Sequence, residues 1–173
     1  KVIKEEKTSI MLVPEISLTP QTVDRFIARF GEEKIAVLHS KLSIGERYDQ
    51  WQKIKSGKAK IIIGARSAIF APVKNLGIII IDEEHDSSYK SEMTPRYNAK
   101  EIAEVLAKKN RIPLILGSAT PDINTYYKAI NNEIVLLELT KRANKASLPN
   151  VEIVDLREEL ANGNRSMINY FQK

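Results

Sequence analysis

The chain has 173 residues, of which 27 are basic and 22 acidic, giving a net charge of +5. It contains no cysteine, which excludes a disulfide framework and a thiolate zinc site. It also has no apolar run near the roughly 20 residues needed to cross a bilayer. These features predict one ordinary globular domain in a reducing cytoplasm. The basic excess suits a polyanionic partner, although a solvated lysine-rich surface explains it equally well.

Short apolar segments alternate with amphipathic ones along the chain. Strands are expected over residues 10–13, 35–39, 60–64, 76–81, 114–117, 135–139 and 151–155. Helices are expected over residues 20–30, 44–55, 98–109 and 121–130. This alternation predicts an α/β fold with a doubly wound, mostly parallel sheet flanked by helices.

Capping signals precede three of the expected helices. They are Thr19 followed by Pro20, Ser43 with Glu46 three residues later, and Thr120 followed by Pro121. In the helix expected over residues 98–109, Ile102, Val105 and Leu106 recur at helical spacing. We therefore expect these three side chains to face the core.

Residues 76–86 read Leu-Gly-Ile-Ile-Ile-Ile-Asp-Glu-Glu-His-Asp. The isoleucine run predicts a strand that is buried on both faces. In open α/β sheets, ligands bind just outside the carboxyl ends of the strands, where this run becomes acidic. Carboxylates at that position suit a hard cation and a water aligned for attack, so the run predicts nucleotide hydrolysis. Taken alone, it could also be a solvated acidic turn.

Two motifs in this region resemble those of superfamily 2 helicases. Asp82-Glu83-Glu84-His85 resembles the Asp-Glu-x-His Walker B box, and residues 116–121 (Leu-Gly-Ser-Ala-Thr-Pro) resemble the Ser-Ala-Thr motif. The resemblance implies ATP and Mg²⁺ as cofactors, with Asp82 holding Mg²⁺ on the nucleotide. It implies that Glu83 positions or deprotonates the attacking water, while His85 couples the site to the next motif. The hydroxyls of Ser118 and Thr120 would hydrogen-bond this box.

Further segments resemble the replication-restart branch of these helicases. They are residues 12–21 (Leu-Val-Pro-Glu-Ile-Ser-Leu-Thr-Pro-Gln), 64–70 (Gly-Ala-Arg-Ser-Ala-Ile-Phe), 82–90 and 95–97. The resemblance implies part of an ATP-dependent 3′→5′ DNA helicase that restarts stalled forks by primosome assembly in the bacterial cytoplasm. Its implied partners are single-stranded and forked DNA, primosome proteins and single-stranded-DNA-binding protein, with no membrane.

Two kinds of residue are candidates for binding single-stranded DNA. Main-chain N–H groups and hydroxyls at helix starts can hold phosphates, and tyrosines beside cations can stack on bases. The candidates are Thr19, Gln21, Arg66, Ser67, Tyr89, Lys90, Arg96 and Tyr97. A structural ion pair is the alternative for Arg66, and packing under the loop is the alternative for Tyr97.

The sequence contains no Gly-x-x-x-x-Gly-Lys-Ser/Thr loop, which cradles phosphates in P-loop NTPases. The resemblance implies that residues 1–140 form a RecA-like first lobe without its Walker A motif, incomplete at the N-terminus. Residues 141–173 are expected to lead toward a second lobe. The zinc-binding insertion of the family is also absent. We expect such a piece to hydrolyse no ATP, and a missing strand would leave edges that favour self-association.

Three other functions remain open from the sequence. The chain could be a non-enzymatic module that binds single-stranded DNA or a primosome partner. It could be a lobe of another superfamily 2 translocase. It could also be a metal hydrolase with Asp82, Glu83, His85 and Asp86 as ligands, although adjacent residues on one turn rarely converge on one ion.

Overall fold

The computed structural model describes residues 2–140 together with residues 155 and 157. The chain divides into two units, Lys1–Val135 and Leu136–Lys173, and the fold below is that of the first. The strand expected over residues 151–155 lies outside the described residues, apart from Asp155. No helix among the described residues is long and apolar enough to span a bilayer.

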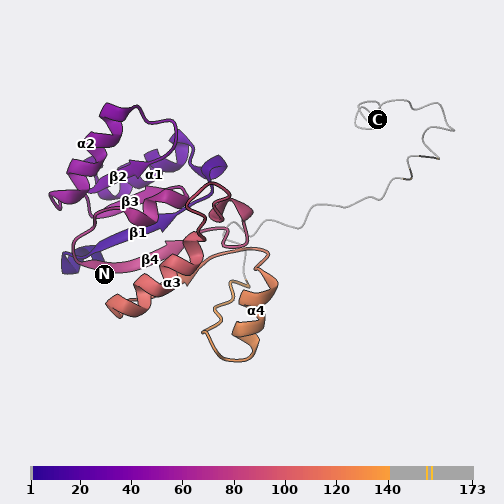
Figure 1. The fold of residues 1–173 in the computed structure, drawn as a ribbon. Coiled ribbons are helices and arrows are strands. Elements are labelled where there is room, and N and C mark those ends of the chain that lie inside the picture. The colour runs from indigo at the N-terminus through magenta and orange to yellow at the C-terminus, as the bar shows by residue number, and fades with distance from the viewer. Residues whose placement is uncertain (1, 141–154, 156, 158–173) are drawn as a thin grey trace. The chain divides into compact units, whose positions relative to one another are not determined.

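A five-stranded, all-parallel sheet forms the centre of the first unit. Its strands are β1 (Thr8–Leu12), β2 (Ile35–Leu38), β3 (Ile61–Gly64), β4 (Leu76–Ile81) and β5 (Leu114–Leu116), in the order β2-β3-β1-β4-β5. Leu12 pairs with Gly64 on one side and Ile81 on the other, so the strands end at a common level. The predicted doubly wound α/β class is confirmed (Figure 1).

The helices that connect the strands begin close to the predicted positions. They are α1 (Pro20–Phe30), α2 (Ile44–Lys55), α3 (Ala99–Asn110) and α4 (Ile123–Ile130), with short 3-10 segments η1 (Val2–Glu5), η2 (Glu15–Ser17), η3 (Glu32–Lys34), η4 (Arg66–Phe70) and η5 (Ser87–Tyr89). Thr19 caps α1, and Ser43 and Glu46 form the predicted capping box of α2. The predicted cap of α4 was wrong. Asp122, not Thr120, accepts hydrogen bonds from the first turn, because its carboxylate lies directly before Ile123.

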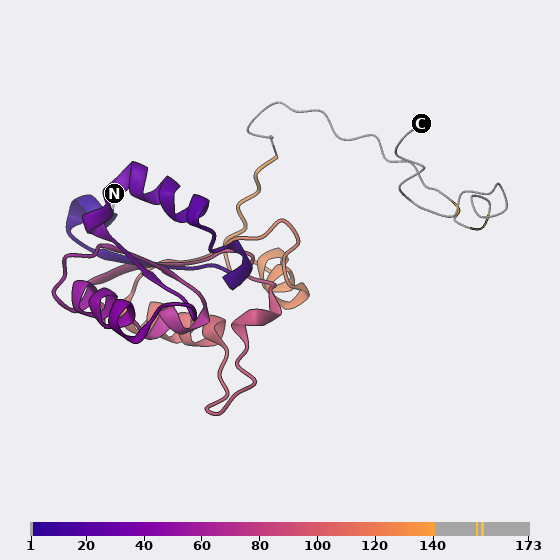
Figure 2. The same cartoon turned by 90° about the horizontal axis from the view of Figure 1, so that it is seen from above.

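Each face of the sheet carries its own core. On one face, buried residues of β1, β3 and β4 pack against α2 and α3; they include Ile10, Leu12, Ile62, Ile79, Ile81, Ile54, Ala99, Ala103 and Ala107. On the other, Ile35, Ile61 and Ile63 pack against Phe26, Ile27 and Phe30 of α1. Figure 2 shows α1 on the side of the sheet opposite to α2 and α3. These two layers hold the carboxyl ends of the strands in place.

The inward face of α3 differs from the prediction. Val105 is 65% exposed, whereas Ala99, Ala103 and Ala107 form the buried stripe at four-residue spacing. Small side chains on this stripe let the helix lie close to the sheet, and the larger Ile102 and Leu106 flank it. The prediction that Val105 faces the core was therefore wrong, because it rested on the hydrophobicity of the side chain alone.

The isoleucine run is only partly buried. Ile79 and Ile81 are fully buried, but Ile78 and Ile80 on the other face are only partly buried. The cause is that α1 packs over β2 and β3 on that face, and its core does not extend to β4. Ile115 of β5 is likewise 45% exposed.

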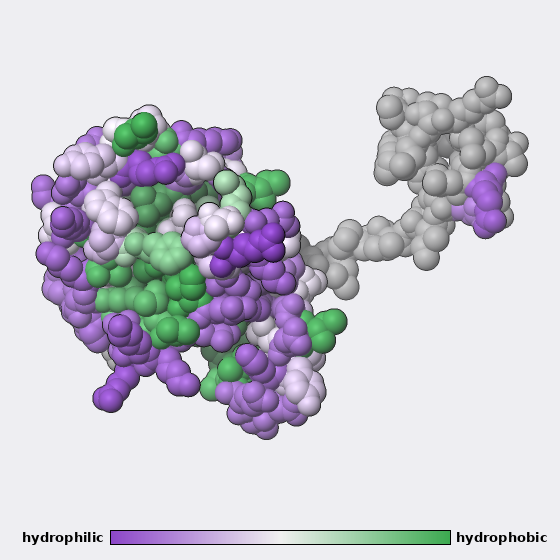
Figure 3. Space-filling model, viewed as in Figure 1, coloured by the Kyte–Doolittle hydropathy of each residue, from purple (hydrophilic) through white to green (hydrophobic). Residues whose placement is uncertain are grey.

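Apolar side chains are also visible on the outer surface. Figure 3 shows hydrophobic residues gathered on one face and framed by hydrophilic ones.

The prediction of a strand over residues 135–139 was wrong, because this apolar run has no regular secondary structure. Val135 and Leu139 are highly exposed there, and an apolar run without a pairing neighbour does not make a stable strand.

Candidate functional site

The loops that follow β4 and β5 are joined at the carboxyl edge of the sheet. The N–H of Gly117 donates to the carbonyl of Ile81 at 2.8 Å, and the N–H of Glu84 donates to the carbonyl of Gly117 at 3.0 Å. Parallel pairing thus continues beyond the strands. It places the Asp82–His85 turn beside the Ser118 loop.

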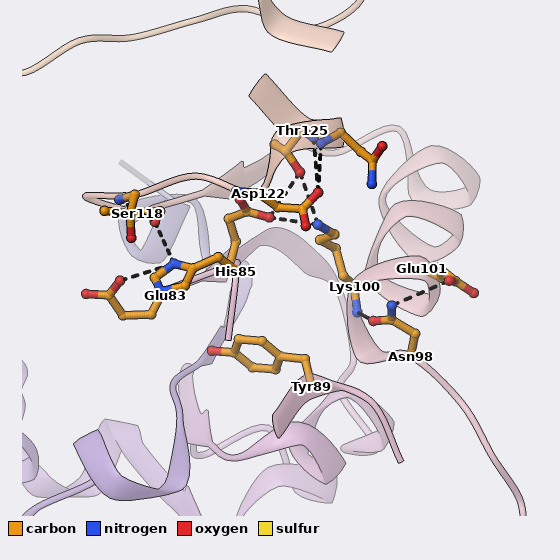
Figure 4. A network of polar contacts seen from close by, with 12 residues as sticks. Glu83, His85, Tyr89, Asn98, Lys100, Glu101, Ser118, Asp122 and Thr125 are labelled. Carbon is orange, nitrogen blue, oxygen red and sulfur yellow. Dashed lines mark hydrogen bonds and ion pairs between the residues drawn. The ribbon is translucent and has the colours of Figure 1, made fainter. Parts of the chain in front are cut away.

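His85 and Ser118 make the side-chain contact between these two loops. His85 Nδ1 lies 2.7 Å from Ser118 Oγ and 3.6 Å from Glu83 Oε2 (Figure 4). The backbone N–H of Thr120 donates to Ser118 Oγ at 3.0 Å. Among the described residues, however, the Thr120 hydroxyl has no hydrogen bond to the acidic box. Of the two hydroxyls predicted to contact the acidic box, only that of Ser118 does so in the described part of the chain.

Asp82 and Glu83 occupy a constrained turn. The N–H of Asp82 donates to the carbonyl of Leu12 at 2.9 Å, and Asp82 Oδ1 accepts from the N–H of Glu83 at 3.1 Å. Glu83 has φ of 45°, in the left-handed region that residues with a side chain seldom adopt. Strained backbone of this kind is frequent at functional sites and needs support from its surroundings.

Sequence reasoning missed a buried polar network around Glu84. This carboxylate accepts hydrogen bonds from Lys100 Nζ at 2.7 Å, from the Asp122 N–H at 2.7 Å and from Thr125 Oγ1 at 3.0 Å. One signal was available in the sequence. Lys100 lies in the first turn of α3, where the helix dipole disfavours a cation, so a specific acidic partner was to be expected.

Tyr89 is placed differently from the base-stacking role predicted for it. Its ring is 2% exposed, and its hydroxyl donates to the backbone carbonyl of Asp82 at 2.6 Å. Burial, assisted by the negative charge of Asp82, raises the pKa of the Tyr89 hydroxyl. A buried ring offers no face to a base. Tyr89 therefore packs beneath the acidic box that it follows in the sequence.

Arg66 fixes the backbone of η5 and of Lys90, the first residue after it. Its guanidinium donates to the carbonyl of Ser88 at 3.2 Å and to the carbonyl of Lys90, and lies 5.8 Å from the ring centroid of Tyr97. Tyr97 also packs edge-on against Phe70, with centroids 5.0 Å apart. Neither an ion pair nor a free cation describes Arg66. Tyr97 is held mainly by packing, which was the alternative considered for it.

The remaining DNA candidates are accessible. Lys90 and Arg96 are exposed on the loop between η5 and α3, which projects from the body of the unit in Figure 2. Gln21 and Ser67 are exposed near the starts of α1 and η4. Thr19 caps α1 by accepting from the Thr22 N–H at 3.3 Å. Since β1 and β3 are neighbours, both starts lie at the same edge of the sheet.

A further contact joins the loops after β1 and β2. The backbone N–H of Ser40 donates to Glu15 Oε1 at 3.3 Å, and the Ser40 hydroxyl donates to the same oxygen. That hydroxyl lowers the pKa of Glu15. Between these loops, a Cβ on Gly64 would lie 2.4 Å from the Leu38 carbonyl oxygen, so only glycine fits there.

Comparison with known proteins identifies the family. The DEAD/DEAH box helicase family matches residues 1–129. The chain belongs to the DEAD/DEAH box helicase family. This membership implies the use of ATP and agrees with the RecA-like sheet described above.

Among helicases of this family, the chain is homologous to replication restart proteins. It is 56% identical to replication restart protein PriA of Bacillus subtilis over 167 residues, covering 96% of this chain and 21% of that protein. It is 51% identical to PriA of Synechocystis and 44% identical to PriA of Treponema pallidum, covering 91% of this chain and 20% and 24% of those proteins, respectively. The chain therefore spans about a fifth of the length of the curated relatives it matches. The predicted resemblance is confirmed.

The acidic turn of this helicase chain fits a nucleotide-bound cation better than a metal held by protein alone. Within the described part of the chain, no three His, Cys, Asp or Glu residues are grouped to hold an ion. Asp86 instead accepts from the Ser88 N–H at 2.8 Å and caps η5. Mg²⁺ in nucleotide sites commonly needs only one or two carboxylates besides the phosphates. Asp82 can supply one such carboxylate.

Proposed function

We propose that this DEAD/DEAH box helicase chain forms most of the first motor lobe of an ATP-dependent 3′→5′ DNA helicase. The parent protein would restart stalled replication forks by primosome assembly in the bacterial cytoplasm. The observation that carries the proposal is the 2.7 Å contact between His85 and Ser118, which joins the two helicase motifs at one sheet edge. The 56% identity to PriA of Bacillus subtilis supports the replication-restart assignment.

Three residues of the acidic turn have roles in this proposal. Asp82 would hold the Mg²⁺ that accompanies ATP, and such an ion would neutralise charge on the phosphates. Glu83 orients the attacking water and accepts its proton. His85 passes the state of the nucleotide site to Ser118, because a change in the turn alters their hydrogen bond. Thr120 supports Ser118 through its backbone N–H, rather than through its hydroxyl.

The DNA strand is proposed to follow the same edge of the sheet. Thr19, Gln21 and Ser67 contact its phosphates at the starts of α1 and η4. Lys90 and Arg96 add positive charge from the projecting loop. That loop is held in place by the contacts of Tyr89, Arg66 and Tyr97. Forked DNA, primosome proteins and single-stranded-DNA-binding protein are the proposed partners of the whole protein.

Residues 1–140 are proposed to be the lobe, and residues 141–173 the connection toward a second lobe. We further propose that residues 1–173 alone do not hydrolyse ATP, because they contain no glycine-rich phosphate loop. DNA-stimulated turnover by this chain alone would overturn that statement.

Unwinding of tailed duplexes by the full-length protein tests the proposal. We expect ATP-dependent release of a labelled strand from a duplex with a 3′ single-stranded tail, and much slower release with a 5′ tail. A matched reaction without ATP controls for passive melting. Equal rates for the two tails would contradict the polarity. No ATP-dependent release from either tail would contradict the helicase assignment.

A non-enzymatic DNA-binding module is the second candidate, favoured by the exposed Lys90 and Arg96. Fluorescence anisotropy of labelled single-stranded DNA with residues 1–173 addresses it directly. Binding that weakens steeply with salt indicates phosphate contacts. Replacing both cations with alanine should lower the salt slope by about one to two units. Such binding without any ATP turnover by the full-length protein would favour the module over the motor.

A further inference from the structure

Glu84 is the buried member of the acidic turn. Its side chain is 1% exposed, while Glu83 and His85 on either side are 43% and 37% exposed. The carboxylate is satisfied by Lys100, the Asp122 N–H and Thr125 Oγ1. In Figure 4, Lys100 of α3 extends toward Asp122 and Thr125 at the start of α4. One side chain therefore joins the β4 turn to two helices.

Stability alone does not account for this arrangement. A buried ion pair often gains no more than the desolvation of its two charges costs, and apolar residues of similar size can serve equally well. What buried, fully satisfied polar networks provide is a single geometry. Lys100 also donates to Thr125 Oγ1 at 3.0 Å, so Glu84, Lys100 and Thr125 each form a hydrogen bond with the other two. The network therefore matters for the backbone that it fixes in place.

What it holds is the left-handed Glu83. On one side, Asp82 is fixed by its N–H bond to the Leu12 carbonyl. On the other, Glu84 is fixed through its side chain and through its N–H bond to Gly117. Glu83, with φ of 45°, lies between these two anchors. Unfavourable backbone persists where the surroundings over-determine it, and Glu84 provides one of the two anchors.

We propose that Glu84 is a positioning residue for ATP hydrolysis, acting through Lys100 and the start of α4 to hold the Glu83 carboxylate toward the attacking water. This inference rests on the proposed function. It makes the third residue of the acidic box a determinant of the reaction rate, not of nucleotide binding. It also makes the position of α4 a control on the Glu83 turn.

The test compares Glu84→Gln with Glu104→Gln in the full-length protein. Glutamine keeps the size of Glu84 but removes the charge opposite Lys100, whereas Glu104 is exposed on α3 and serves as the matched control. For Glu84→Gln we expect kcat of DNA-stimulated ATP hydrolysis to fall about tenfold or more, with KM for ATP within about twofold, because misplacing a catalytic group affects the transition state. For Glu104→Gln, both constants should stay within about twofold of wild type.

A second variant separates positioning from simple damage. In Glu84→Gln, Lys100 is left without its counter-ion, so adding Lys100→Gln should restore at least part of kcat by making a neutral, hydrogen-bonded pair. Unchanged kcat in Glu84→Gln would overturn the inference. A loss explained by a lower folded fraction, seen as a matching drop in active-site titre with normal kcat per active molecule, would also overturn it.

Amide exchange distinguishes failure of this inference from failure of the proposed function. In the 173-residue chain, Glu84→Gln should speed exchange of the backbone amide of residue 84 about tenfold. The exchange rates of the β1 amides should not change comparably. If the wild-type full-length protein hydrolyses no ATP, the proposed function fails whatever the exchange shows. If it does hydrolyse ATP but neither kcat nor exchange responds to Glu84→Gln, only the positioning role fails.

Discussion

The hydroxyl of Tyr89 donates a 2.6 Å hydrogen bond to the backbone carbonyl of Asp82, the residue proposed to hold the nucleotide's cation. The ring lies beneath the turn and is 2% exposed. Movement of η5, which carries Tyr89, would therefore be transmitted directly to the backbone of Asp82. This contact gives a physical link between the proposed DNA loop and the proposed nucleotide site.

Replacing Tyr89 should destabilise the fold. Tyr89→Phe removes one hydrogen bond and should lower the free energy of unfolding by about 1 kcal/mol. Tyr89→Ala also removes a buried ring and should lower it by about 3 kcal/mol or more. Urea denaturation measures both. The control is Tyr48→Ala, on a side chain that is 60% exposed. Equal effects of the two alanine substitutions would show that Tyr89 is not buried.

The role of Arg66 can be tested by amide exchange in the loop it clamps. Hydrogen bonds from a charged donor are worth about 1.5–3 kcal/mol, and each 1.4 kcal/mol corresponds to a factor of ten. Arg66→Gln should therefore speed exchange of peptides covering residues 88–97 about tenfold. Arg25→Gln, at an exposed position of α1, should leave them unchanged. Unchanged exchange in Arg66→Gln would return Arg66 to the role of a free phosphate contact.

Glu15 should make the tie to Ser40 dependent on pH. The Ser40 hydroxyl lowers the pKa of Glu15 from its ordinary value of 4.5. A carboxyl whose pKa is lower in the folded state stabilises the fold above its unfolded pKa, and this contribution disappears as pH falls through the folded pKa. The difference in unfolding free energy between wild type and Glu15→Gln should be below about 1 kcal/mol at pH 7, since the contact is exposed, and should shrink below pH 4.5.

The same titration with Glu104→Gln provides the control, because the carboxylate of this exposed glutamate has no hydrogen-bond partner among the described residues. Its difference from wild type should stay flat with pH. A wild-type advantage over Glu15→Gln that grows as the solution becomes more acidic would contradict the contact.

Sequence patterns predicted elements whose signals are local. The caps at Thr19 and Ser43 lie within one turn of the groups they satisfy, so their chemistry is visible in the sequence. The acidic box was predictable because it follows an apolar strand and the Ser-Ala-Thr motif follows the next one. The buried side of α3 was not predictable. Alanines gave a weak hydrophobic signal, and Val105 gave a strong one on the wrong side.

Two site features depended on contacts between distant segments. Tyr89 and Arg66 looked like DNA-binding residues because their types and neighbours suit bases and phosphates. Only the fold shows that η4 and η5 meet, so that the guanidinium of Arg66 reaches the Ser88 carbonyl. Glu84 was overlooked because nothing local indicates which residue of an acidic run points inward.

The exposed Ile115 on β5 predicts self-association of residues 1–173. β5 is an edge of the sheet, and Ile115 on it is 45% exposed. Unpaired edges without charge readily pair with other chains. Light scattering should show a mass above that of a monomer, and Ile115→Lys should shift it toward the monomer. Val105→Lys, at another exposed apolar position, should not. A monomeric wild-type chain at high concentration would contradict this.

The most direct test of the central claim is DNA-stimulated ATP hydrolysis by the full-length protein, with Glu83→Gln beside Asp86→Asn. If Glu83 accepts the proton of the attacking water, its amide variant should lose roughly a hundredfold or more in kcat. Asp86→Asn keeps the cap of η5 and should stay near wild type. Hydrolysis that needs Glu83 but not Asp86 is the predicted result. Wild-type protein that shows no DNA-stimulated hydrolysis, or full activity in Glu83→Gln, would contradict the account.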